Sequence, residues 1–166
     1  QDWKNLSKSY YDSSPIINGI KVPILWGTDA VHGHNNVIGA TIFPHNIGLG
    51  ATRNELLVKQ IGSAVAREVA STGIIWTFAP TVAVPKNNMW GRTYEGFSEN
   101  TNLVASLGKS FIIGLQGENE SFLDEDHILA TVKHFVGDGG TNNGIDQGDT
   151  IIDELSLKEI HARPYY

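Results

Sequence analysis

Three short apolar runs alternate with longer segments of helical periodicity along the chain. The runs cover residues 22–28, 74–79 and 128–132, and each is too short for a typical helix and rich in strand-forming residues. The sequence therefore predicts three buried strands. Pro23 fits near the start of the first strand, where a missing backbone donor is tolerated, and Pro80 stops the second.

An amphipathic helix is predicted between the first two strands, because apolar residues recur at helical spacing over residues 56–69. Its start is marked by a capping box that runs from Thr52 to Glu55, in which the Thr52 side chain accepts a hydrogen bond from the amide of Glu55. Gly73 is expected to end the helix in a left-handed conformation.

A second amphipathic helix is predicted over residues 103–115, beginning near Asn100 and closing at Gly117. Gly108 and Gly114 each weaken an isolated helix by about 1 kcal/mol. We therefore expect these two glycines to allow close packing of the helix on the strands.

The two ends of the chain are predicted to be less regular. Residues 1–20 form a polar lead-in segment without chemistry of its own, in which Trp3 covers an apolar edge. Near the other end, a capping box from Ser156 to Glu159 predicts a last helix that is cut short near Pro164.

The order of these elements, three strand–helix units in succession, predicts an α/β fold with parallel strands joined by right-handed crossovers. Such strands bring their carboxyl ends to one edge of the sheet. Asp29 follows the first strand, Arg92 lies in the long loop after the second, and Lys133 and His134 follow the third. A glycine-rich turn, residues 137–140, comes directly afterwards. We therefore expect these four side chains to be neighbours in space.

These side chains suit a neutral ligand with many hydroxyl groups. Asp29 can accept from two vicinal hydroxyls, while the three basic side chains donate to the same oxygens. Indole rings can cover the apolar face of a sugar, and three tryptophans lie near the predicted edge in sequence: Trp26, Trp76 and Trp90. A phosphate site would not place Asp29 beside its ligand.

A metal site and a phosphate site are the alternatives to a sugar site. His32, His34, His45 and Asp29 could supply metal ligands, but the histidines lie in a glycine-rich loop where hydrogen bonding is the simpler role. The turn at residues 137–140 could cradle a phosphate, yet it lacks the spacing of a phosphate-binding loop. The prediction is therefore no metal and no cofactor.

Composition excludes several classes of protein. The net charge is −6 and the basic residues are few and dispersed, so no nucleic-acid partner is expected. No apolar run approaches the roughly 18 residues of a membrane span, so no membrane partner is expected. The chain has no cysteine, which excludes disulfides and thiolate metal sites.

Four blocks of sequence together resemble the N-terminal domain of glycoside hydrolase family 3, which includes β-glucosidases and exo-acting β-glucan hydrolases. The blocks are Gly-Thr-Asp-Ala-Val-His-Gly at 27–33, Phe-Pro-His-Asn-Ile-Gly-Leu-Gly-Ala-Thr at 43–52, Trp-Gly-Arg-Thr-Tyr-Glu-Gly-Phe-Ser-Glu at 90–99 and Lys-His-Phe-Val-Gly-Asp-Gly-Gly at 133–140. They stand in the order that the family shows and lie within the stretch from residue 22 to about 163.

The resemblance implies a (β/α)8 TIM-type barrel and a retaining double-displacement mechanism. By position in the motifs, it implies that Asp29, Arg92, Lys133 and His134 bind hydroxyls of the sugar in the first subsite. Glu95 and Asp138 are expected to support the loops and these binding residues. The catalytic nucleophile and the acid/base belong to motifs that are not among these residues, so both are expected downstream of Tyr166.

Two details bear on the branch of the family. Residues 86–89, Lys-Asn-Asn-Met, replace the more usual Asp-Pro-Arg before Trp-Gly-Arg, so the detail of that loop is expected to differ. Residues 136–139, Val-Gly-Asp-Gly, replace the Pro-Gly-His-Gly turn of the β-N-acetylglucosaminidase branch. The resemblance therefore favours a glucosidase or glucanase.

Three strand–helix units cannot close an eight-stranded barrel of about 250 residues. Residues 1–166 are therefore predicted to be the first part of the catalytic barrel of a retaining β-glycosidase, inactive by itself. Its partners would be a β-linked glucoside or oligosaccharide, the remainder of the barrel and a second domain. The family resemblance is compatible with a secreted or periplasmic location. The alternatives are a non-catalytic sugar-binding α/β module and, more distantly, a nucleotide-binding sheet domain.

Overall fold

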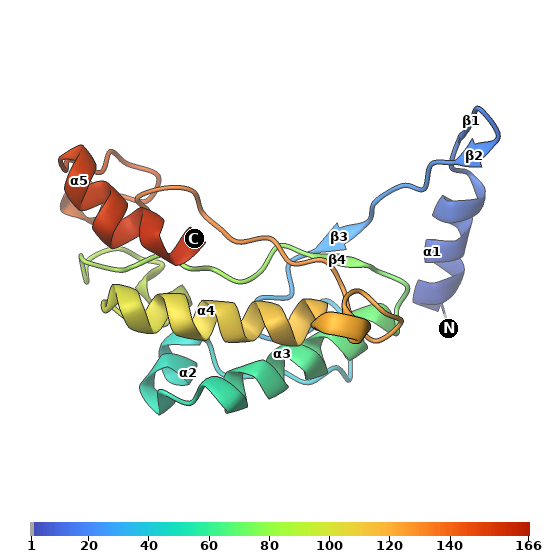
Figure 1. Ribbon diagram of the computed structural model, residues 1–166, viewed down its shortest axis with the longest axis horizontal. Coiled ribbons are helices and arrows are strands. Elements are labelled where there is room, and N and C mark those ends of the chain that lie inside the picture. The colour runs from blue at the N-terminus through green and yellow to red at the C-terminus, as the bar shows by residue number, and fades with distance from the viewer. Residues whose placement is uncertain (1) are drawn as a thin grey trace.

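The computed structural model describes residues 2–166 as a layer of parallel extended segments packed on two long helices, with an arm at the N-terminal end (Figure 1). The helices are α3, Glu55–Ala70, and α4, Thr101–Gln116. They lie side by side on one face of the extended segments. This arrangement confirms the α/β class.

The parallel layer is more sparsely paired than the sequence predicts. Strand β3, Gly27–Thr28, pairs in parallel with β4, Trp76–Thr77. The third segment runs beside β4 and joins it through single parallel bridges, Trp76 to Leu129 and Thr81 to Lys133. The three segments therefore run in parallel as predicted, but only Gly27–Thr28 and Trp76–Thr77 are strands, and the third segment, residues 128–132, is extended without being a strand. Their ladders are short because residues 22–26 belong to no strand of the described chain, the amide of Val22 bonding back to Pro15 of the N-terminal arm, and because Pro80 lacks a backbone N–H.

Asparagine side chains begin both long helices. The Asn54 side chain accepts from the amide of Leu57 at 3.0 Å, and Asn100 caps α4 in the same way. The predicted capping box at Thr52 is therefore wrong, because Thr52 is the last residue of a preceding short helix, α2, Asn46–Thr52. The predicted end of α4 at Gly117 is confirmed, with φ +70°. Gly73 also has the predicted positive φ, +85°, three residues after α3 ends.

The main core lies between the helices and the parallel segments. Buried apolar residues of α3 and α4 form one side of this core, and buried apolar residues of the extended segments pack against them. Its members include Val58, Val65, Val69, Ile74, Ala79, Val82, Leu107, Phe111, Leu115 and Ile128.

Glycines set how closely the helices approach their neighbours. A Cβ on Gly114 would overlap the backbone of α3 at Lys59, and a Cβ on Gly62 would lie 2.6 Å from the carbonyl oxygen of Phe111. A Cβ on Gly108 would lie 2.8 Å from Val82. The predicted close packing on the strands therefore holds for Gly108, whereas Gly114 packs against the other helix. Sequence periodicity did not distinguish these two surfaces.

The N-terminal arm consists of α1, Asp2–Asp12, and a hairpin of β1, Ile16–Ile17, with β2, Ile20–Lys21. No residue of α1 is buried. Trp3 packs on Trp26 with ring centroids 5.9 Å apart, so this tryptophan covers an apolar side chain as expected.

The C-terminal end is helical but irregular. The Asp153 side chain accepts from the amide of Ser156 at 2.9 Å and starts α5, Glu154–Ser156. The predicted capping box at Ser156 is therefore wrong by three residues. The helix continues as a π-helical stretch, Leu157–Ala162, and a 3-10 turn, Arg163–Tyr165, which contains Pro164 at the predicted stop. Further 3-10 turns lie at Thr93–Glu95, Asn119–Ser121 and Asn142–Gly144.

Within residues 2–166, the part of the chain that the structure describes, none of the helices is both long enough and apolar enough to cross a membrane.

Replacing Gly114 by alanine is expected to destabilise the protein by about 2 kcal/mol or more, because the new Cβ would force α3 and α4 apart. The gain in helix propensity, about 1 kcal/mol, offsets only part of this cost. Urea unfolding followed by circular dichroism measures the change. Gly91→Ala is the control, since nothing lies within 4 Å of a Cβ at that position. Equal stability of the two variants would contradict the close helix contact.

His34 is fully buried in the core region, and its hydrogen bonding predicts acid sensitivity. The Thr72 hydroxyl donates to the carbonyl of Val69 at 2.6 Å, so its oxygen accepts from Nε2 of His34 at 3.1 Å. Nδ1 of His34 is then a buried lone pair without a partner in the described chain. Burial lowers the pKa of His34, while Glu68 raises it to a lesser extent.

The free energy of unfolding is therefore expected to fall as the pH drops below about 6.5, where the unfolded chain takes up a proton that folded His34 resists. One such group contributes at most about 1.4 kcal/mol per pH unit. Denaturant unfolding at a series of pH values should show a shallower acid slope for His34→Gln than for the parent. An unchanged slope would mean that His34 is not a source of this sensitivity.

Candidate functional site

The ends of the first and third parallel segments meet through an ion pair. Asp29 directly follows β3, and Lys133 lies at the bridge that joins the third segment to residue Thr81. Nζ of Lys133 donates to Oδ1 of Asp29 at 2.6 Å, although the two residues are 104 positions apart in sequence. The Asp29 side chain is 61% exposed and the Lys133 side chain 17%. The carboxylate therefore still has open surface on which to accept from a ligand.

Arg92 is held by its own loop. The 3-10 turn at Thr93–Glu95 brings the Glu95 side chain next to that of Arg92. Nε and Nη2 of Arg92 donate to the two carboxylate oxygens of Glu95, each at 2.8 Å. This two-point contact raises the pKa of Arg92 and fixes the plane of the guanidinium. The sequence expectation that Glu95 supports a neighbouring residue matches this geometry.

His134 connects Arg92 to the glycine-rich turn. Nη2 of Arg92 lies 3.3 Å from Nε2 of His134, and Nδ1 of His134 lies 2.7 Å from Oδ2 of Asp138. A guanidinium can only donate, so Nε2 accepts, and in the neutral ring the proton sits on Nδ1. Nδ1 is close to Asp138 but lies outside hydrogen-bond geometry. The structure therefore joins Arg92, His134 and Asp138 in one chain of polar contacts.

A pocket of about 230 Å³ opens at the carboxyl ends of the parallel segments, and Asp29, Arg92 and Lys133 all line it. His134 contacts Arg92 but lines a neighbouring pocket of about 430 Å³, together with Asp138. The structure thus brings the four residues into two contacting pairs and places three of them around one pocket. The other residues that line the first pocket are Val31, His32, Asn35, His45 and Glu95.

The tryptophans do not provide the expected sugar platform in the described chain. Trp90 is 2% exposed, and its Nε1 donates to Asp146 at 2.8 Å, so it is a core residue that anchors a loop. Trp26 packs against Trp3 and Tyr10 of the N-terminal arm. Trp76 donates to the Thr131 hydroxyl at 2.7 Å. Proximity in sequence was a poor guide to these rings, because each is engaged in contacts outside the pocket wall.

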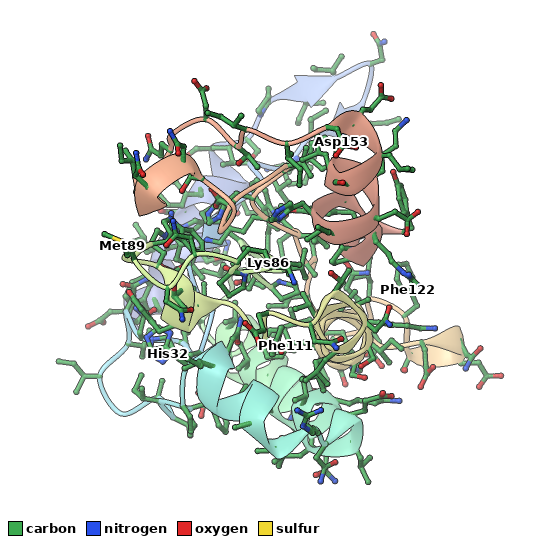
Figure 2. All side chains as sticks on the ribbon, turned by 90° about the vertical axis from the view of Figure 1, so that its left-hand side faces the viewer. His32, Lys86, Met89, Phe111, Phe122 and Asp153 are labelled. Atoms are coloured by element: carbon green, nitrogen blue, oxygen red, sulfur yellow. The ribbon has the colours of Figure 1, made fainter. Side chains whose placement is uncertain are left out.

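The histidines of the glycine-rich loop take part in packing and in the pocket wall. Nδ1 of His32 lies 3.0 Å from the carbonyl oxygen of Phe43, in agreement with the loop hydrogen bond that the sequence favours. Figure 2 shows His32 in the loop that leads from β3 into α2. Among residues 2–166, no group of three or more metal-ligating side chains is positioned to hold an ion. The sequence grouped His32 and His45 with Asp29 only as alternative metal ligands and did not predict that they line one pocket with Asp29 and Arg92.

The glycine-rich turn, residues 137–140, packs against the loop before Arg92 through Gly139. The carbonyl oxygen of Gly139 accepts from the backbone amides of Lys86 and Asn87, at 2.7 and 3.1 Å. Gly139 has φ +83°, and a Cβ there would lie 2.8 Å from Pro85. This contact ties the turn that follows His134 to the loop that precedes Arg92.

The arrangement of charges can bind hydroxyl groups from several sides. Asp29 accepts, while Lys133 and Arg92 donate, and each charge already faces an opposite charge within 3 Å. A neutral ligand can share these contacts without adding a charge of its own.

Comparison with known proteins gives a consistent result. The model described as the glycosyl hydrolase family 3 N terminal domain matches residues 1–166. The chain is 34% identical over 141 residues to a lysosomal β-glucosidase of Dictyostelium discoideum, covering 83% of this chain and 17% of that protein. It is 31% identical to a β-xylosidase of Formosa agariphila, covering 92% of this chain and 22% of that protein.

Among solved structures, the exo-1,3/1,4-β-glucanase from a Pseudoalteromonas species superposes with a TM-score of 0.92 and 51% sequence identity, covering 99% of this chain and 21% of that one. The chain therefore spans about a fifth of the length of the relatives that it matches.

Proposed function

This chain belongs to the glycoside hydrolase family 3 N-terminal domain family, and from that premise we propose that it is the sugar-binding part of a retaining β-glycosidase. The observation that carries the proposal is the Asp29–Lys133 ion pair in the same pocket wall as Arg92. An acceptor flanked by fixed donors at the carboxyl ends of parallel strands is suited to the hydroxyls of one pyranose ring. The bond hydrolysed would be that of a terminal β-D-glucosyl residue.

The roles divide along the two contacting pairs. Asp29 accepts from ligand hydroxyls, and Lys133 holds that carboxylate in place while donating to the same ligand. Arg92, which lines the same pocket, is the further donor and is oriented by Glu95. His134 is the fourth proposed contact because of its position in the family motif, although its Nε2 already accepts from Arg92 and its Nδ1 lies beside Asp138. Its place in the adjoining pocket is consistent with a sugar that extends past Arg92.

The chemical step is proposed to come from residues downstream of Tyr166. Retaining hydrolysis needs two carboxyl groups about 5–5.5 Å apart, one as nucleophile and one as acid and then base. Both carboxylates of the pocket are engaged by basic partners, Asp29 by Lys133 and Glu95 by Arg92. We therefore give them binding roles and no covalent step.

An eight-stranded barrel is the proposed setting of the pocket, with residues 1–166 as its N-terminal part. The parallel direction of the three segments and the helices on one face support this arrangement. The pocket of about 230 Å³ is smaller than the roughly 300–1,000 Å³ of typical ligand sites. Further barrel strands and a second domain, as the greater length of the relatives suggests, would complete its walls.

The name of one relative favours a second candidate substrate. The Formosa agariphila protein is a β-xylosidase, and xylosides differ from glucosides only in lacking the hydroxymethyl group. The test is the ratio of kcat/KM for aryl β-glucoside and aryl β-xyloside with the full-length protein. A ratio in favour of the xyloside would replace the glucosyl proposal.

The purified 166-residue chain is expected not to hydrolyse an aryl β-glucoside, because it lacks the proposed nucleophile and acid/base. Release of the aryl alcohol above the uncatalysed background measures this directly. Full-length protein assayed in parallel is the positive control. Turnover by the 166-residue chain would show that the nucleophile lies within it.

In the full-length protein, Asp29→Ala is expected to lower kcat/KM, with a loss of about 2–4 kcal/mol in transition-state stabilisation. The reason is that hydroxyl contacts strengthen in the oxocarbenium-like transition state. Steady-state kinetics with an aryl β-glucoside measures the loss. Asp124→Ala is the matched control, since Asp124 pairs with His127 away from the pocket. Unchanged kinetics for Asp29→Ala would remove the hydroxyl-binding role.

A further inference from the structure

Two imidazole rings stand face to face in the wall of the candidate pocket. The rings of His32 and His45 have centroids 3.8 Å apart and planes inclined by 27°. Both residues line the pocket that Asp29, Arg92 and Lys133 share. The roles assigned above leave this pair unused.

The hydrogen bond of His32 determines which of its nitrogens carries the proton. Its Nδ1 lies 3.0 Å from the carbonyl oxygen of Phe43. A carbonyl only accepts, so Nδ1 is the donor, and in the neutral ring Nε2 is left as an acceptor. Within residues 2–166 no protein donor is bonded to Nε2, and this atom is not among the buried polar atoms that lack a partner, so it reaches the surface of the described chain.

His45 supports the His32 ring from behind. Its Nδ1 is buried, and the His45 ring also forms a T-shaped contact with Tyr94, with centroids 4.7 Å apart and planes at 87°. Burial lowers the pKa of His45, and the neighbouring His32 lowers it further, while Glu95 raises it to a lesser extent. His45 therefore presents a neutral ring face to His32 and holds its orientation.

The hydrogen-bond acceptors of the pocket differ in whether a protein donor already occupies them. Lys133 already donates to Asp29, and Arg92 already donates to both oxygens of Glu95. Nε2 of His32 is an acceptor that no protein donor occupies in the described chain. A sugar hydroxyl carries a proton that must find an acceptor when the sugar leaves water, because an unsatisfied polar group is costly to bury.

We propose that His32 is a further sugar-contacting residue, whose Nε2 accepts a hydrogen bond from one hydroxyl of the bound sugar, with His45 as a positioning residue that holds its ring by stacking. This proposal rests on the proposed function of the pocket as a sugar subsite. It adds a neutral acceptor to the charged groups already assigned and so gives the pocket a contact that depends on one particular hydroxyl.

Calorimetric titration of the full-length protein with D-glucose and with each monodeoxy glucose tests the proposal. His32→Ala is expected to weaken glucose binding roughly three- to tenfold, the effect of one neutral hydrogen bond. For the one monodeoxy glucose that lacks the donated hydroxyl, parent and variant should bind equally. His32→Gln should recover part of the affinity for glucose, because its side-chain oxygen can accept.

Two further variants separate binding from folding. His45→Ala is expected to weaken glucose binding, whereas His45→Phe should restore it, since the phenyl ring keeps the stacking face and loses both nitrogens. His127→Ala, whose side chain pairs with Asp124 elsewhere, is the control. Thermal melting of every variant confirms that it is folded before titration.

The outcomes are distinct. Equal weakening for glucose and for every monodeoxy glucose, or no weakening at all, would overturn the contact from His32. Hydrolysis of an aryl β-glucoside by the parent is measured separately. If the parent binds glucose without hydrolysing the glucoside, the glycosidase proposal fails, and the titrations still decide the role of His32. If the parent does not bind glucose, both fail together.

Discussion

Parallel backbone pairing is the constraint on which the rest of this structure depends. The amide of Phe78 donates to the carbonyl of Thr28, and that of Val82 donates to the carbonyl of Lys133, at 2.9 and 2.8 Å. These two bonds set the register of the outer segments against the central one. Because both outer segments run in the same direction, the side chains that follow them emerge on the same edge. Asp29 and Lys133 meet for this reason.

The helices make that pairing possible with few ladder bonds. Short parallel segments have little stability of their own, so the apolar faces of α3 and α4 must cover them. The close approach of these helices at Gly62 and Gly114 lets one compact layer cover the segments. The position of the polar side chains at the edge of the layer therefore depends on the packing of α3 and α4 against the segments.

Charges at the site are arranged in partnered sets rather than singly. Asp29 faces Lys133, Glu95 faces Arg92, and Asp138 faces His134. Each pairing fixes the direction of a side chain before a ligand arrives, which reduces the ordering that binding requires. The glycine-rich turn contributes by bonding to the loop before Arg92. The turn and the loop before Arg92 thus support each other.

By itself, the sequence determined the α/β class, the positions of both long helices, the places of the parallel segments and the family. These follow from periodicity and local motifs, which depend on residues close together along the chain. It also indicated that Asp29, Arg92, Lys133 and His134 would be neighbours, because parallel strands share one edge.

Only the tertiary structure decided which surfaces meet. It showed that Trp90 is in the core, that Gly114 faces a helix, that Asn54 rather than Thr52 caps α3 and that His32 stacks on His45 beside Asp29. The physical reason is that side-chain direction and partner choice are settled by packing between segments distant in sequence, and no local pattern records that packing.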